Sequence, residues 1–158
     1  MEDRKRTAEI TDRFQTYFTL NLKKLDVQTL SRDNYKSLVT KIENLETGSA
    51  LPRALIAYYY AFFNLMKDYS TTIFCPLIID APNQGDQDIE HIDDIMRFIN
   101  DNQPAGSQMI LGISEDFGVD FRCKTELLTE KFSLLNAGQY EDVMAEMFPK
   151  MQRLWFTK

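Results

Sequence analysis

Apolar residues recur every three to four positions near the beginning of the chain, after a strongly charged first stretch. The stripe runs through Ile10, Phe14, Tyr17, Phe18, Asn21, Leu22 and Leu25. This period predicts one amphipathic helix over residues 2–25. Its charged first turns are expected to be solvated, so that the helix either projects from the domain or continues a longer element. A weaker alternation over residues 30–46 predicts one or two short strands or turns.

A second helix is predicted after a small flexible loop. Thr47, Gly48 and Ser49 form the loop, and Pro52 suits the first turn of a helix. From Arg53 to Lys67 the chain is apolar on nearly every side of a helix. A helix of this kind is expected to be buried.

A strand, a helix and a second strand are predicted in the middle of the chain. The run from Thr72 to Ile79 is apolar without alternation and ends at Asp80, which predicts a strand inside a parallel sheet covered on both faces. A turn over residues 81–85 and an amphipathic helix from Asp88 to Ile99 follow. The run from Met109 to Ile113 predicts the second strand.

This order of elements is that of a βαβ crossover, which is normally right-handed and sets its strands parallel. The carboxyl ends of both strands then lie at one edge of the sheet, and Ser114 and Glu115 follow the second strand as Asp80 follows the first. Ligands of open parallel sheets bind at that edge. The predicted fold class is therefore α/β, with a mainly parallel sheet flanked by helices.

A last helix is predicted near the carboxyl end. Asn136 suits its cap, and the helix extends over Tyr140–Trp155 with an interruption or bend near Pro149. Residues 121–123 and 132–135, which precede it, are expected to be edge strands or loops. The apolar face of the helix belongs either to the domain's own core or to a docking surface. That face contains Met144, Met147, Met151, Leu154 and Trp155.

Length and composition fit one globular domain over residues 1–158. Hydrophobic residues make up 44% of the chain, and its net charge of −6 argues against a protein that grips nucleic-acid phosphates unaided. Cys75 and Cys123 are not spaced as zinc ligands, and the chain has only one histidine that could serve as a further ligand. This argues against a zinc site and a disulfide scaffold. A reducing, cytoplasmic location is expected. The longest apolar run, Ala54–Phe63, is too short to cross a membrane.

Asp80 is the first candidate for chemistry. A carboxylate at the end of a hydrophobic strand is how nucleotide hydrolases hold Mg²⁺, which prefers hard oxygen ligands on a rigid support. A strand that ends in aspartate is common, however, and such a residue more often caps the next turn. Upstream, the loop from Gly48 to Ala50 opens onto the buried helix and offers backbone amides, a hydroxyl and a helix amino end to a phosphate.

Together these residues resemble the carboxyl-terminal half of the ATPase head in SMC-like, ABC-type ATPases of DNA repair, chromosome maintenance and related bacterial systems. In that family a signature motif opens a long helix, and the Walker B strand ends in Asp-Glu-Pro. Ser49 and Ala50 match the first two signature positions, whereas Leu51 stands where a second glycine is usual. Residues 77–80 match Walker B, and Pro82 matches its trailing proline.

The resemblance covers residues 5–135 and implies a partial P-loop NTPase-type fold, with the signature and Walker B lobe over residues 47–135. The helix over residues 2–25 would be the base of the coiled-coil arm that interrupts these heads. The stretch 84–88 falls where the D-loop should lie, and Met109–Ser114 matches the last strand.

The resemblance also implies site residues and cofactors. Asp80 would bind Mg²⁺, and Gln84 would take part in catalysis. The loop before the buried helix would reach across a dimer to the γ-phosphate of ATP in the opposite head. The residues implied to contact the cofactor are Gly48, Ser49, Ala50, Arg53, Asp86, Asp88 and Ser114.

Several parts of the family pattern are missing from this chain. No GxxxxGK[ST] motif occurs, so ATP and Mg²⁺ would bind only together with a Walker A-bearing amino-terminal half or a second ATPase head. Ala81 replaces the catalytic glutamate expected after Asp80, and Ser114 or Glu115 replaces the switch histidine. Without its other half, the lobe would expose sheet edges and apolar surface and would self-associate. DNA would be bound through the whole assembly.

Two other functions are compatible with the same residues. With Ala81 and no switch histidine, the chain would be a non-catalytic interaction module with a degenerate nucleotide site. Alternatively, Asp86 and Asp88 would hold Mg²⁺ for a TOPRIM-like nuclease, although no glutamate lies at the end of an earlier predicted strand. His91 is the only histidine and is expected to be a solvated surface residue in preference to a metal ligand.

Overall fold

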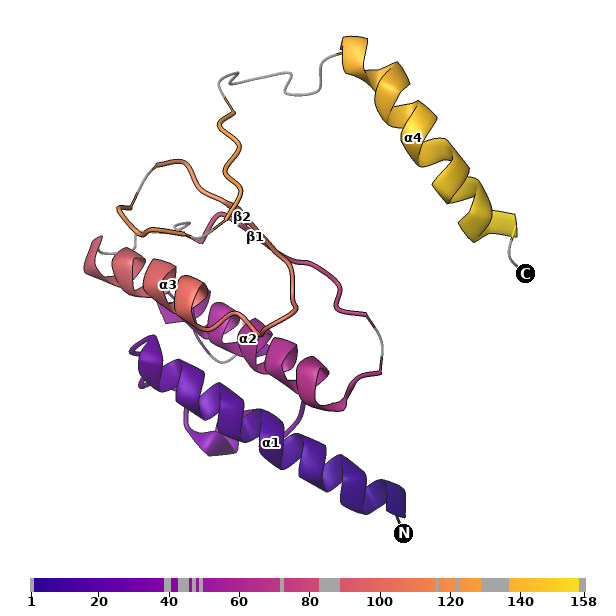
Figure 1. Ribbon diagram of the computed structural model, residues 1–158. Coiled ribbons are helices and arrows are strands. Elements are labelled where there is room, and N and C mark those ends of the chain that lie inside the picture. The colour runs from indigo at the N-terminus through magenta and orange to yellow at the C-terminus, as the bar shows by residue number, and fades with distance from the viewer. Residues whose placement is uncertain are drawn as a thin grey trace. The chain divides into compact units, whose positions relative to one another are not determined.

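The chain forms two compact units, which comprise Met1–Phe121 and Arg122–Lys158. The computed structural model describes residues 2–38, 41–42, 46, 48, 50–71, 73–82, 89–115, 117–121, 123–128 and 137–156. The first unit contains the predicted strand, helix and strand, and the second contains the last helix (Figure 1).

The amphipathic helix at the start of the chain is α1 (Glu2–Lys24), as predicted. Its apolar stripe is buried from Phe14 onward except at the half-buried Tyr17, whereas residues 3–9 are exposed. The segment predicted as strands or turns contains the 3-10 helix η1 (Arg32–Tyr35), and none of its described residues is in a strand. The described residues of this segment therefore form turns and a short 3-10 helix in place of strands.

The predicted buried helix is α2 (Ala50–Tyr69), which runs antiparallel to α1 and forms the centre of the core with it (Figure 1). Phe14 of α1 lies edge-on to Tyr58 of α2, with ring centroids 5.5 Å apart. The buried amide of Asn21 donates a hydrogen bond of 3.0 Å to the carbonyl of Ala57. The polar member of the α1 stripe is thereby satisfied inside the core.

The strands β1 (Leu77–Asp80) and β2 (Met109–Gly112) pair in parallel, as predicted. Their register places Asp80 opposite Gly112, the last residue of each strand. β1 is shorter than the predicted run, because the described residues before Leu77 form no strand. Pro76 immediately precedes it and has no amide hydrogen to donate to a ladder.

Between the strands, α3 (Ile89–Asp101) forms the crossover and contributes Ile95 and Ile99 to the core. The hydroxyl of Tyr60 in α2 donates a hydrogen bond of 3.1 Å to the Ile99 carbonyl and lies 3.2 Å from the sulfur of Met109. Burial raises the pKa of Tyr60 well above its ordinary range. One buried hydroxyl thus links α2, α3 and β2.

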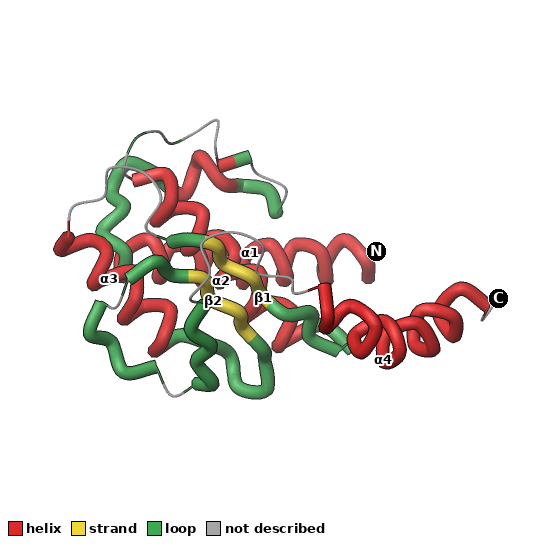
Figure 2. The backbone as a smooth tube through the Cα atoms, turned by 90° about the horizontal axis from the view of Figure 1, so that it is seen from above, coloured by secondary structure: helices red, strands yellow, loops and turns green. Residues whose placement is uncertain are grey.

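Among the described residues of the first unit, the helices pack on one face of the sheet. Side chains on the inner face pack against the core, and they are Leu77, Ile79, Met109 and Leu111. Ile78 and Ile110, which pair across the outer face, are 64% and 49% exposed. The prediction of a sheet covered on both faces is wrong for these residues. In Figure 1 α2 and α3 lie on the same side of the strands, and in Figure 2, seen from above, the strands lie over α2.

The second unit contains α4 (Ala137–Phe156), so the last predicted helix is confirmed, with Pro149 inside it. An exposed apolar face extends along this helix and includes Tyr140, Val143, Met147 and Phe148. Of the predicted edge strands before it, Phe121 and Cys123 are not in a strand, and residues 132–135 lie outside the described residues. Asn136 lies outside them as well.

Candidate functional site

Asp80 lies at the carboxyl end of β1, where the sequence predicts a metal-binding carboxylate. Its side chain is exposed. A Cβ atom added to Gly112 would lie 2.8 Å from Asp80 Oδ1, so the glycine leaves the space that the carboxylate occupies. Ser114 follows shortly after the end of β2 and is also exposed. Asp80, at the end of β1, and Ser114, shortly after β2, therefore lie at the same edge of the sheet.

The turn that leads into α2 is the second part of the predicted site. Gly48 has a φ of +65°, in the left-handed region that favours glycine. The amide of Leu51 donates a hydrogen bond of 3.2 Å to the carbonyl of Gly48, which closes the turn. Ala50 is the first residue of the helix. Ser49, the predicted signature hydroxyl, lies outside the described residues.

Arg53 is buried in the first turn of α2, with 6% of its surface exposed. Its Nη1 atom lies 2.9 Å from Nδ1 of His91, in the first turn of α3. Because arginine keeps its protons, Arg53 is the donor and Nδ1 the acceptor, which places the imidazole proton on Nε2. The expectation of a solvated His91 is wrong, because the ring is half-buried and bonded to Arg53.

These features lie toward the same end of the first unit. In Figure 1 the carboxyl ends of both strands and the amino ends of α2 and α3 face the same side. Helix amino ends attract anions because their amides carry partial positive charge. The edge thus carries a carboxylate and two helix amino ends, which are groups suited to a metal–phosphate ligand. The predicted site residues Gln84, Asp86 and Asp88 lie outside the described residues.

Asp80 has no described neighbours that complete a protein-only metal site. Across the described part of the chain, no three His, Cys, Asp or Glu side chains come together as metal ligands. An Mg²⁺ ion at Asp80 would take its other ligands from water, from phosphate or from another chain, which is how this ion is commonly held beside nucleotides.

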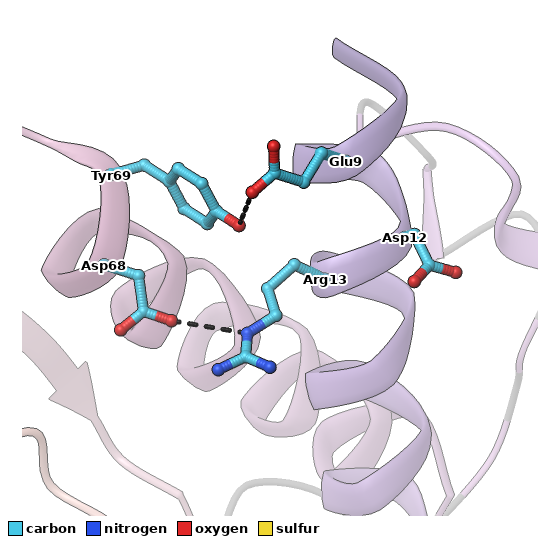
Figure 3. Close-up of a pocket in the computed structure, with 5 residues that line it drawn as sticks. All are labelled: Glu9, Asp12, Arg13, Asp68 and Tyr69. Atoms are coloured by element: carbon cyan, nitrogen blue, oxygen red, sulfur yellow. Dashed lines mark hydrogen bonds and ion pairs between the residues drawn. The ribbon is translucent and has the colours of Figure 1, made fainter. Parts of the chain in front are cut away.

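A separate pocket lies between α1 and the carboxyl end of α2 (Figure 3). It has a volume of about 570 Å³ and is lined by Glu9, Asp12, Arg13, Asp68 and Tyr69. Arg13 pairs with Asp68 at 3.5 Å, and the Tyr69 hydroxyl donates to Glu9 at 3.0 Å. These exposed contacts join the two helices, and each contributes little to stability. The lining is mainly acidic, which does not suit a phosphate, so this pocket is distinct from the predicted nucleotide site.

The contact between Arg53 and His91 is the feature of this region that the sequence pattern does not reveal. Its partners come from separate helices, and helical periodicity carries no information about such pairs. One signal points toward it, because Arg53 is the only charged residue of α2 before Lys67. A charged group in an apolar, buried helix requires a hydrogen-bonding partner.

The chain is similar to Lamassu protein LmuB from Bacillus cereus (strain VD014), with 29% identity over 103 residues. The match covers 61% of this chain and 18% of LmuB, so the chain spans less than a fifth of the length of that relative. No protein-family model matches the chain, and no solved structure matches it. None of the helices in the described residues combines the length and apolar character needed to span a membrane.

Proposed function

We propose that this chain is the carboxyl-terminal lobe of an SMC-like ATPase head that completes a composite ATP and Mg²⁺ site with a Walker A-bearing half. The observation that carries the proposal is the position of Asp80 at the carboxyl end of β1, beside β2 and toward the amino ends of α2 and α3. Ligands of parallel sheets bind at this edge. The similarity to Lamassu protein LmuB supports a distant relationship to SMC-like proteins.

In this proposal each part of the edge has a distinct role. Asp80 provides an oxygen ligand for Mg²⁺, which neutralises phosphate charge when ATP is bound. The loop over residues 48–50 offers backbone amides to the γ-phosphate of a nucleotide held by the opposite head. Gln84 takes the place of the missing base and orients the attacking water. The other residues proposed to serve the nucleotide site are Arg53, Asp86, Asp88 and Ser114.

The exposed side of the sheet supports the idea of an incomplete lobe. Parallel strands are normally buried on both faces, whereas Ile78 and Ile110 are exposed here. Among the described residues, β1 and β2 have only each other as neighbours in the sheet. We propose that the Walker A-bearing half covers this surface, that the lobe self-associates when that half is absent, and that DNA is bound by the completed assembly.

The test is reconstitution with a Walker A-bearing partner chain. We expect the complex to bind ATP in the presence of Mg²⁺, and Asp80→Asn to weaken binding about tenfold, which corresponds to ~1.4 kcal/mol. The matched control is Asp101→Asn, because Asp101 is an exposed carboxylate at the opposite end of α3. A verified complex that binds no ATP contradicts the proposal.

A non-catalytic interaction module is the second candidate, and it is favoured by Ala81. This residue directly follows Asp80 in place of the glutamate that would act as a general base. A module would bind its partner and a nucleotide without hydrolysis. Phosphate release by the reconstituted complex distinguishes the two functions, because turnover that Asp80→Asn abolishes supports the ATPase, whereas binding without turnover supports the module.

A further inference from the structure

The contact between Arg53 and His91 joins two parts of the proposed nucleotide site. Arg53 belongs to the first turn of α2, which begins at Ala50, two residues after Gly48. His91 belongs to the first turn of α3, which follows the segment after Asp80. Their hydrogen bond of 2.9 Å therefore connects the amino end of α2 to the amino end of α3, the helix that follows β1 in the chain.

Arg53 is buried, and among the described residues its side chain makes one hydrogen bond, to His91. Only 6% of the surface of Arg53 is exposed, and within the described residues its buried Nε has no hydrogen-bond partner. Buried polar groups are normally hydrogen-bonded, and an unsatisfied buried donor is unfavourable. If the imidazole moved away, a second N–H group would lose its acceptor in the interior. Arg53 and His91 are therefore constrained to move together.

We propose that Arg53 and His91 are a positioning pair that holds the amino ends of α2 and α3 together, so that the turn at Gly48 and the sheet edge at Asp80 keep a fixed spacing. This inference rests on the proposed function and concerns the same site. It gives Arg53 a positioning role in place of direct contact with nucleotide, because the residue is buried. His91 acts on the loop through Arg53.

The first experiment reads the contact directly, by nitrogen NMR of the full chain labelled in its imidazole ring. His91 is the only histidine, so a single pair of ring resonances reports on it. We expect one tautomer, with Nε2 protonated and Nδ1 as acceptor, and a changed Nδ1 resonance in Arg53→Met. Arg97→Met is the matched control, because Arg97 is an exposed arginine of α3. Mixed tautomers, or an Nδ1 resonance unaffected by Arg53→Met, overturn the inference.

The second experiment measures Mg²⁺-dependent ATP binding by the complex with the Walker A-bearing half. His91→Phe keeps a ring but removes the acceptor, whereas His91→Asn places an amide oxygen near the position of Nδ1. We expect His91→Phe and Arg53→Met each to weaken binding about tenfold, the double variant to bind no more weakly than either, and His91→Asn to restore most of the affinity. Thermal unfolding verifies that each variant is folded.

The outcomes separate the inference from the proposed function. If Arg53→Met weakens ATP binding while His91→Phe does not, Arg53 acts without His91 and the positioning pair is overturned. If wild type binds ATP and both single variants bind it equally well, the inference fails while the proposed function stands. If the wild-type complex binds no ATP, the proposed function fails and the inference fails with it.

Discussion

The carboxylate of Asp80 occupies space that any side chain at Gly112 would enter. A Cβ at Gly112 would lie 2.8 Å from Oδ1 and 3.4 Å from Cγ of Asp80. The two residues are paired at the ends of β1 and β2, so the missing side chain of one strand makes room for the carboxylate of the other. Gly112 therefore helps to determine where the proposed Mg²⁺ ligand lies.

We expect Gly112→Ala to displace the Asp80 carboxylate and to leave the strand in place, because the nearest atom is the end of a side chain. The free energy of unfolding should fall by about 1 kcal/mol. ATP binding by the complex with the Walker A-bearing half should weaken as it does in Asp80→Asn. Urea unfolding and ATP titration measure the two effects.

The Asp80→Ala background tests the cause of this effect. In that background Asp80 Oδ1, the atom that a Cβ at Gly112 would contact, is absent. Gly112→Ala should therefore have little effect on the free energy of unfolding. Strictly additive effects in the double variant would contradict the proposed collision.

Tyr60 predicts a loss of stability at alkaline pH. Because burial raises the pKa of its hydroxyl above the ordinary value of 10.0, the folded protein retains a proton that the unfolded chain releases. The stabilisation of the folded protein by the raised pKa of Tyr60 is fully present below about pH 10. Above about pH 10 the free energy of unfolding declines by up to ~1.4 kcal/mol per pH unit as the pH rises toward the folded pKa. Urea unfolding between about pH 8 and pH 11 measures the decline.

Tyr60→Phe is the matched variant for this measurement. At neutral pH it should lower the free energy of unfolding by about 1 kcal/mol, because the hydrogen bond to the Ile99 carbonyl is lost. Above pH 10 its decline should be shallower than that of wild type. Some decline should remain, because burial, followed by the neighbouring Asp68, also raises the pKa of Tyr17. An unchanged slope would show that Tyr60 is not responsible.

Phe14 is expected to be essential for the packing of α1 on α2. It is fully buried, and its ring centroid lies 5.1 Å from that of Phe62. Phe14→Ala should lower the free energy of unfolding by about 3–5 kcal/mol, because it removes buried surface and leaves a cavity. Leu20 lies in the same helix but is 50% exposed, so Leu20→Ala should cost less than about 1 kcal/mol. Comparable losses in chemical denaturation would contradict this packing.

The outer face of the sheet is expected to cause self-association of the isolated chain. Ile78→Lys places a charge on this face, and it should shift the chain toward the monomer with little change in thermal stability, because Ile78 is mostly exposed. Leu20→Lys is the control, since it adds the same charge at an exposed leucine of α1. Sedimentation over a range of concentrations measures the effect. A wild-type chain that stays monomeric throughout would contradict the prediction.

The order of helices and strands was predictable because each element has a clear period or a long apolar run. The same argument placed Asp80 at the end of a strand and β2 beside it. The exposure of the outer face was not predictable, because the run that contains Ile78 has the same composition whether that face is covered by the same chain or by another. The bond between Arg53 and His91 depends on how α2 and α3 pack, which their separate periodicities do not specify.

The pairing of β1 with β2 across α3 also has a consequence for synthesis on the ribosome. α1 and α2 emerge before the strands and can pack on each other while the segments that follow them are still being made. β1 emerges without its partner, because Met109, the first residue of β2, follows only after the whole of α3. A nascent chain that stops before Met109 would carry Asp80 on an unpaired segment. The edge proposed to bind nucleotide is therefore among the last parts of the first unit to be completed.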